Sequence, residues 1–159
     1  MATFQADGTI TRAAPLTDTS TLDINETNGY YIQRDGFGPG EVSFRREDIK
    51  SPYMRGTYNV HAVKDQMTST LRIRVDGGGT VSQTISRLET LVEAFEQWQY
   101  TLTINIGGVS WQYVCDAADY AVGNNGSLED LWLRSHMQMV TFQIPHRPPQ
   151  FGTSSSIGE

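Results

Sequence analysis

Residues 80–115, TVSQTISRLETLVEAFEQWQYTLTINIGGVSWQYVC, contain the two periodicities from which the fold can be predicted. From Val81 to Gln97, apolar residues recur at helical spacing. At about 100° per residue they fall within a stripe roughly 80° wide, which predicts an amphipathic helix with one core-facing side. The core positions of this helix are Val81, Ile85, Leu88, Val92 and Phe95. Thr80 and Gln83 form a capping-box pattern where the stripe begins.

The second half of the stretch predicts a β-hairpin. Apolar and polar residues alternate from Tyr100 to Ile106, and the alternation resumes from Val109 to Cys115. Gly107 and Gly108 lie between the two runs, and two glycines can both take the positive φ of a type I′ turn. Helix and hairpin therefore follow one another directly.

Further strands are predicted on both sides of this stretch. Residues 68–75 alternate with Ser69, Leu71, Ile73 and Val75 on one face, which is typical of a half-buried strand. We expect it to pair with residues 57–63 around a turn at 64–66. Shorter strands are predicted at 30–34 and 41–45, separated by a turn in DGFGPG (35–40). A long strand is predicted at 131–144, where a midway change of apolar parity suggests either a bulge or a strand with two different surroundings. Residues 117–130 are expected to be a connection.

These elements predict a mainly β (α+β) fold, an antiparallel split β-barrel or sandwich with one flanking amphipathic helix. Residues 1–28 contain only isolated apolar residues and are expected to form an N-terminal arm. The barrel domain would span 29–149, with a flap at about 45–56 that follows neither periodicity. Three prolines follow residue 144 closely, so we expect the ladder to stop there and residues 150–159 to form a flexible tail.

Composition excludes several classes of protein. The chain has 159 residues, only 12 of them Lys or Arg, and a net charge of −6. A nucleic-acid-binding protein needs a basic patch, so this charge argues against one. One cysteine, Cys115, excludes an intrachain disulfide and a cysteine-rich zinc site. The sequence has no apolar run of about 18 residues and no apolar signal-peptide core, so we expect synthesis in a reducing cytosol and no membrane association.

No pattern predicts catalysis, a cofactor or a metal. The three histidines, His61, His136 and His146, have no metal-ligand spacing. Cys115 alternates with aromatic residues, as a small core residue does. The acidic pairs 116/119 and 129/130 are better explained as turn caps than as catalytic carboxylates. Gly77–Gly79 precedes a helix, as an anion-binding loop does, but no Lys-Ser/Thr follows, so a strand–helix turn is the better interpretation.

Charge is distributed unevenly along the chain. Arginines gather in the first half, and acidic residues predominate from residue 89 onward. This pattern is compatible with ordinary solvated surface, and also with a dipolar subunit whose basic part meets the acidic part of a neighbour. For the second interpretation, the subunit-interface candidates are Arg45, Arg46, Tyr53 and Arg55 in the flap.

Residues 30–149 resemble the minor tail or distal tail proteins of long-tailed phages, especially those of actinobacterial hosts. The resemblance rests on four stretches in order: RREDIKSPYMRGTYNVHAVKDQMTSTLRIRV, TISRLETLVEAFEQWQYTLTINIGG, ADYAV and MVTFQIPHRPPQFG. The resemblance lies in the order of these stretches and in their overall residue pattern, since none of them is a specific signature.

The resemblance implies a structural virion protein with a tail-tube-like split β-barrel. It implies a homo-oligomeric ring, usually a hexamer, that joins the tail tube to the hub and tip proteins and leaves a channel through which DNA passes without specific binding. The chain is shorter than many distal tail proteins and has no room for a second, carbohydrate-binding-like domain. A tail tube or tube-end protein therefore remains an alternative. So does a free-standing ligand- or carbohydrate-binding module, for which the aromatic residues Tyr30, Tyr31, Trp98 and Trp132 would serve.

Overall fold

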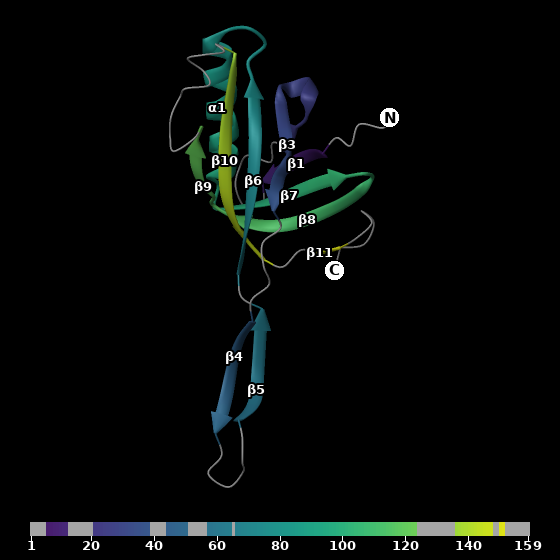
Figure 1. Ribbon diagram of the computed structural model, residues 1–159, viewed down its shortest axis with the longest axis vertical. Helices are drawn as coiled ribbons and strands as arrows, with labels where there is room; N and C mark the ends of the chain where they lie inside the picture. The colour runs from purple at the N-terminus through teal and green to yellow at the C-terminus, as the bar shows by residue number, and fades with distance from the viewer. Residues whose placement is uncertain are drawn as a thin grey trace.

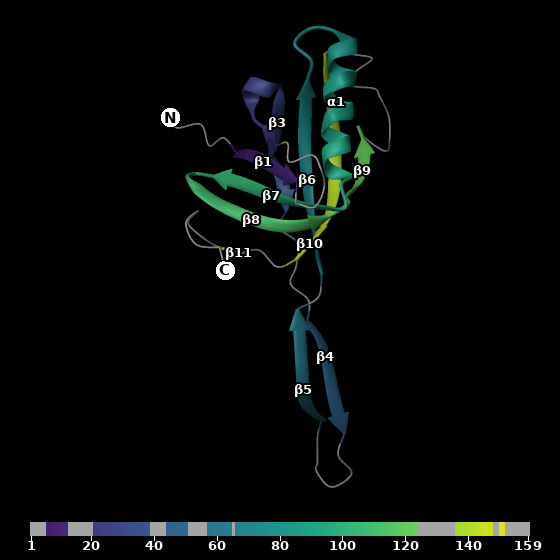
Figure 2. The same ribbon diagram turned by 180° about the vertical axis from the view of Figure 1, so that it is seen from behind.

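In the part of the chain that the computed structural model describes, the main sheet has nine antiparallel strands and curls into a nearly closed barrel, with helix α1 packed against it (Figures 1 and 2). The main path of the sheet runs β2-β1-β7-β8-β10-β6-β3, with β11 paired to β8 and β9 to β10. The structure describes residues 6–12, 21–38, 44–50, 57–64, 66–123, 136–147 and 150–151. The predicted fold class, an antiparallel barrel with one flanking helix, is confirmed.

The centre of the sheet is the pair β6 (Met67–Asp76) and β10 (Met137–His146), which are in register along their whole length. On β6 the predicted alternation is confirmed, because residues 69, 71, 73 and 75 are all buried. Of the two interpretations of the last strand, the bulge is absent from β10, whose even-numbered residues are buried from 138 to 146; residues 131–135 of the predicted strand lie outside the described residues. Met137 and Met139 are only partly buried on the opposite face, so their apolar character marks no change of parity.

Strand β3 (Tyr30–Gly38) pairs with the other edge of β6 and is longer than predicted. The expected turn at 35–40 is wrong for residues 35–38, which continue the strand after a register shift between Ile32 and Phe37. A bulge accommodates the glycines there without ending the pairing.

The hairpin of β7 (Gln99–Ile106) and β8 (Val109–Asp116) is confirmed. Gly107 and Gly108 have φ of 60° and 83°, as a type I′ turn requires.

The N-terminal stretch contains two strands and a short helix, so the expectation of irregular structure is wrong there. Strand β1 (Ala6–Arg12) pairs with β7, and β2 (Thr21–Ile24) pairs with β1, followed by the 3-10 helix η1 (Glu26–Asn28). Ile10 and Ile24 are fully buried. Isolated apolar residues are thus sufficient for strands that add to the β7 edge of the sheet, a place that local periodicity does not reveal.

Helix α1 (Val81–Phe95) begins at the predicted cap, where the Thr80 side chain accepts a hydrogen bond from the Gln83 amide at 3.3 Å. Its buried side is centred on Thr84, Leu91, Ala94 and Phe95, with Leu88 and Val92 partly buried. Val81 and Ile85, which the predicted stripe placed in the core, are instead 43% and 39% exposed. The buried face is therefore rotated by roughly 60° at about 100° per residue, because small Thr84 and Ala94 allow close approach to the sheet.

A separate two-stranded hairpin projects away from the barrel (Figure 1). It consists of β4 (Phe44–Lys50) and β5 (Thr57–Lys64), both described through their backbone. Two predictions are wrong here: residues 46–50 of the expected flap form a strand, and residues 57–63 pair with β4 rather than with β6. The strand at 57–63 was thus predicted, but its partner was not, because a residue pattern within one strand does not identify the strand that pairs with it.

Two short strands complete the sheet. Strand β9 (Asp119–Val122) interrupts the expected connection at 117–130 and pairs with β10. Strand β11 (Gln150–Phe151) lies in the expected tail and pairs with β8. Pro145 does not stop the ladder, since β10 continues to His146 opposite Met67.

The core lies between the curved sheet and α1. Phe95 stacks on Phe142 of β10 with ring centroids 4.1 Å apart, and it meets Tyr100 of β7 edge-on at 5.7 Å. These contacts fasten the C-terminal end of the helix to two parts of the sheet.

Candidate assembly surfaces

Two chemically reactive side chains of the described residues, Cys115 and His146, lie in the core. Cys115 is fully buried, as predicted for a core residue, and burial raises the pKa of its thiol to about 12. The thiol therefore stays protonated at neutral pH, and a protonated, enclosed thiol is a poor nucleophile. Burial also raises the pKa of the Tyr113 hydroxyl, to about 12.

His146 belongs to a buried hydrogen-bonded group. Its Nε2 lies 2.5 Å from Ser69 Oγ, and its Nδ1 lies 2.6 Å from the carbonyl oxygen of Arg147. The Tyr113 ring packs edge-on against the imidazole at 4.9 Å between centroids. Both ring nitrogens have partners and the group is enclosed, so it ties β6 to β10 rather than forming an accessible dyad.

In the glycine turn before α1, the backbone amides of the first two glycines already donate hydrogen bonds within the protein, so they cannot bind an anion. The Gly77 amide donates to the His136 carbonyl oxygen at 2.8 Å, and the Gly78 amide donates to Asp76 Oδ1 at 2.8 Å. The interpretation of this segment as a strand–helix turn is therefore confirmed.

Within the part of the chain that the structure describes, no three His, Cys, Asp or Glu side chains come together as metal ligands would. In that same part, no helix is long and apolar enough to span a membrane. Asp116 and Asp119 are exposed at strand ends, and Asp116 accepts a hydrogen bond from Gln66 at 2.8 Å.

The predicted interface residues are placed only in part. Arg45 and Arg46 lie on β4, opposite Val63 and Ala62 of β5, while Tyr53 and Arg55 lie outside the described residues. The assignment of these four residues to an interface stays a prediction.

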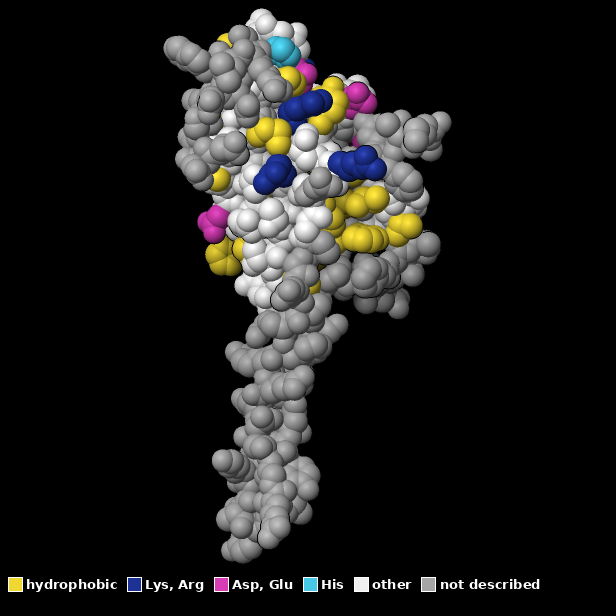
Figure 3. Space-filling view, viewed as in Figure 1, with side chains coloured by type: hydrophobic (Ala, Val, Ile, Leu, Met, Phe, Trp, Pro, Cys, Tyr) yellow, Lys and Arg dark blue, Asp and Glu magenta, His cyan; other side chains and the backbone are white. Residues whose placement is uncertain are grey.

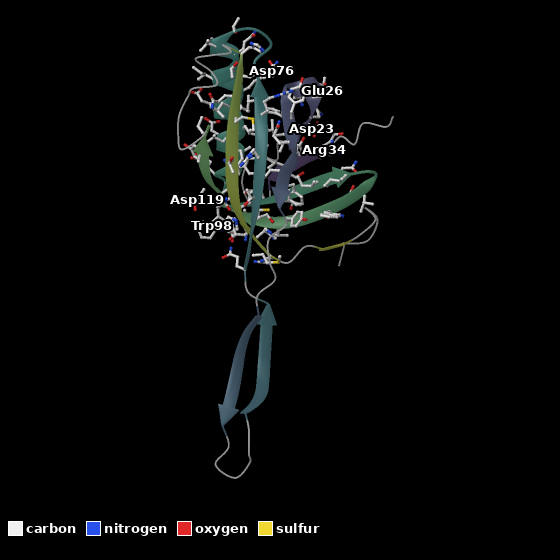
Figure 4. All side chains as sticks on the ribbon, in the orientation of Figure 1. Asp23, Glu26, Arg34, Asp76, Trp98 and Asp119 are labelled. Atoms are coloured by element: carbon white, nitrogen blue, oxygen red, sulfur yellow. The ribbon has the colours of Figure 1, made fainter. Side chains whose placement is uncertain are left out.

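One face of the barrel, on the side of the sheet away from α1, is basic. Arg72 is exposed on β6, and Arg74 stacks over the Tyr31 ring at 4.4 Å from its centroid. Arg34 of β3 is also exposed (Figure 4). Figure 3 shows Lys and Arg side chains gathered on this face.

An acidic and aromatic surface is found where α1 ends. Trp98, just after the helix, is 78% exposed, and Tyr120 of β9 is 45% exposed. The Ala118 amide donates to the Phe95 carbonyl oxygen at 2.9 Å, which holds the two segments together. Figure 4 places Trp98 and Asp119 at the same corner of the barrel, and Figure 3 shows acidic and apolar side chains adjoining at that edge. We call Trp98, Tyr120 and the exposed Glu93 and Glu96, together with Asp119 on the other face of β9, the aromatic corner.

Of the four aromatic residues suggested as a ligand-binding set, Trp98 is exposed, while Tyr30 is buried and its hydroxyl donates to the Arg87 carbonyl oxygen at 3.0 Å. Tyr31 is partly covered by Arg74, and Trp132 lies outside the described residues. The described members of this set therefore do not form one exposed aromatic surface on which a ligand could bind. Sequence analysis missed Tyr120, although the alternation in DYAV after the hairpin was the available signal.

Comparison with solved structures shows the fold. The chain is similar to the sheath/tube terminator of an extracellular contractile injection system, PVC, in the extended state, with a TM-score of 0.52, 7% identity and 96% coverage of both chains. It also matches a chain of the anti-feeding prophage (AFP) baseplate with a TM-score of 0.40, 10% identity and coverage of 94% of this chain and 93% of the other. No known protein family's sequence pattern matches the chain, and no curated protein does.

Proposed function

We propose that the chain is a structural subunit of a phage tail or a phage-tail-like injection particle. The observation that supports this most is the likeness to a sheath/tube terminator over 96% of both chains. Cys115 and His146 are enclosed, and the exposed charged and aromatic surfaces are those that an assembling protein would use.

In this proposal copies of the chain form a closed ring, a hexamer, coaxial with the tail tube. A ring requires two different patches that fit each other on neighbouring subunits. The basic sheet face, the projecting hairpin and the aromatic corner provide patches of opposite charge on one subunit. The ring joins the tail tube to the tail hub and tip as a distal or minor tail protein does, leaves a channel for DNA, and is assembled in the host cytoplasm.

A position at the terminator end of the tube is the second candidate. It is favoured by the function that the neighbour's name states, a sheath/tube terminator. The two candidates differ in partner: the distal ring contacts hub and tip proteins, whereas a terminator contacts the last ring of the tube.

The proposal is tested by assembly. The purified chain is followed by light scattering at rising concentration, alone and with the products of the genes that flank its own, and the products are viewed by electron microscopy. We expect closed rings, or rings capping one end of tube-like particles. A chain that stays monomeric beside all of these proteins contradicts the proposal.

A further inference from the structure

We propose that the aromatic corner is the docking site for the β4–β5 hairpin of a second copy of this chain. This inference rests on the proposed function, since it names the contact that would join subunits in the ring.

The first argument is that the hairpin lacks a packing partner. Among the described residues, β4 and β5 form a sheet of their own and pair only with each other. A lone two-stranded hairpin is marginally stable in water. With strands of seven and eight residues, it extends about 25 Å at roughly 3.3 Å per residue, far enough to reach another subunit. A surface on a neighbour would supply the packing that its own barrel does not.

The second argument is charge. Residues 44–64 include five basic and two acidic side chains, a net charge of +3, listed along the chain as Arg45, Arg46, Glu47, Asp48, Lys50, Arg55 and Lys64. Since the whole chain carries −6, the remainder carries −9. The hairpin is thus attracted to the body of another copy, and the attraction is greatest where acidic groups gather.

The third argument is that the aromatic corner is electrostatically unfavourable in one subunit alone. The last turn of α1 has no basic residue, although a helix C-terminus favours cations. Glu93 and Glu96 are exposed there instead, and Asp119 lies at the same corner. A basic partner would offset the unfavourable interaction of Glu93 and Glu96 with the helix dipole.

The fourth argument is that the corner offers contacts that a β-hairpin can use. Trp98 is the most exposed of the large apolar side chains among the described residues, and tryptophan and tyrosine are enriched in interface hot spots. Within the described part of the chain, β9 pairs on one side only, with β10. That edge has no strand partner among the described residues, and such an edge can pair with an incoming strand.

The test is charge reversal on each side of the contact. The donor variant carries Arg45→Glu, Arg46→Glu and Arg55→Glu, and the acceptor variant carries Glu93→Lys, Glu96→Lys and Asp119→Lys. Each alone should lose ring assembly in light scattering and electron microscopy. A chain that carries both sets restores opposite charges across the contact, so it should assemble again.

Separate variants test the aromatic side chains and the competing surface. Trp98→Ala should raise the concentration for half-assembly roughly 30-fold, as loss of a hot spot does. Its melting temperature should stay within about 2 °C, because the side chain is exposed. Asp7→Lys, an exposed acidic site on β1, is the matched control for the acceptor set and should assemble normally.

Arg72→Glu tests whether the basic sheet face, rather than the hairpin, binds the aromatic corner. If it abolishes assembly while the donor variant assembles, the aromatic corner receives the basic sheet face and the inference is overturned. If both reversed sets leave the rings of an assembling chain unchanged, the inference is wrong and the proposed function stands. If the unmodified chain does not assemble with any tail protein, the proposed function fails as well.

Discussion

Replacement of Leu91 or Ile85 by alanine tests which side of α1 faces the core. Leu91 is fully buried, whereas Ile85 is 39% exposed, and each substitution removes three carbon atoms from the same helix. The predicted stripe included Ile85 and omitted Leu91, so the two orientations make opposite predictions for this pair.

The expected magnitudes follow from burial. Loss of three buried carbons at about 0.8 kcal/mol each costs roughly 2.4 kcal/mol, and the cavity brings Leu91→Ala to about 3 kcal/mol or more. Ile85 already contacts water and leaves no closed cavity. Alanine also has the better helix propensity by a few tenths of a kcal/mol, so Ile85→Ala should cost about 1 kcal/mol or less.

Thermal and urea unfolding of the two variants provide the assay. A chain of this size loses about 2–4 °C of melting temperature per kcal/mol, so we expect a fall of roughly 6–12 °C for Leu91→Ala and at most about 4 °C for Ile85→Ala. Equal losses, or a larger loss for Ile85→Ala, would refute the orientation of the helix.

Three other predictions follow from the fold. An added Cβ at Gly77 would lie 2.7 Å from Thr84 Cα, so Gly77→Ala should cost about 1–3 kcal/mol in urea unfolding, while Gly38→Ala, with open space around it, should change little. Burial raises the pKa of Cys115 in the folded protein to about 12, whereas the pKa in the unfolded chain is near 9. The contribution of the buried, neutral thiol to the stability of the fold is therefore complete below about pH 9 and is lost as the pH rises from about 9 to about 12. Unfolding free energy should therefore fall by up to about 1.4 kcal/mol per unit above pH 9, less steeply in Cys115→Ala. Assembled protein, at −6 per chain, should not hold duplex DNA in gel-shift assays at low salt.

Sequence periodicity predicted the elements whose signals lie within a few neighbouring residues. The α1 cap at Thr80, the β7–β8 hairpin with its two glycines and the alternation of β6 depend on local geometry, and local geometry is readable from neighbouring residues. The fold class follows from these three elements.

Pairings between distant segments were not predictable in the same way. Strand β1 has only Ile10 as a fully buried large side chain, and its place in the sheet depends on β7. The buried side of α1 is likewise decided by the sheet, which admits Thr84 and leaves Ile85 outside. For the assembly surfaces, the sequence indicated the opposite charges and the exposed Trp98. It did not indicate that Tyr120 and Asp119 lie beside that tryptophan, because the Phe95–Ala118 hydrogen bond joins segments on either side of a hairpin.

The pairing of β1 with β7 also constrains the order in which the chain can fold during synthesis. Ala6 lies opposite Ile106, so the first strand of the barrel has no partner on that side until about 100 more residues have been made. At roughly 5–20 residues per second, that interval lasts about 5–20 s. Such distant pairing also slows closure, since contacts of high sequence separation form late. During this time the β1–β2 pair presents an unsatisfied edge, the same edge that another nascent chain would offer, so barrel closure competes with aggregation on the ribosome.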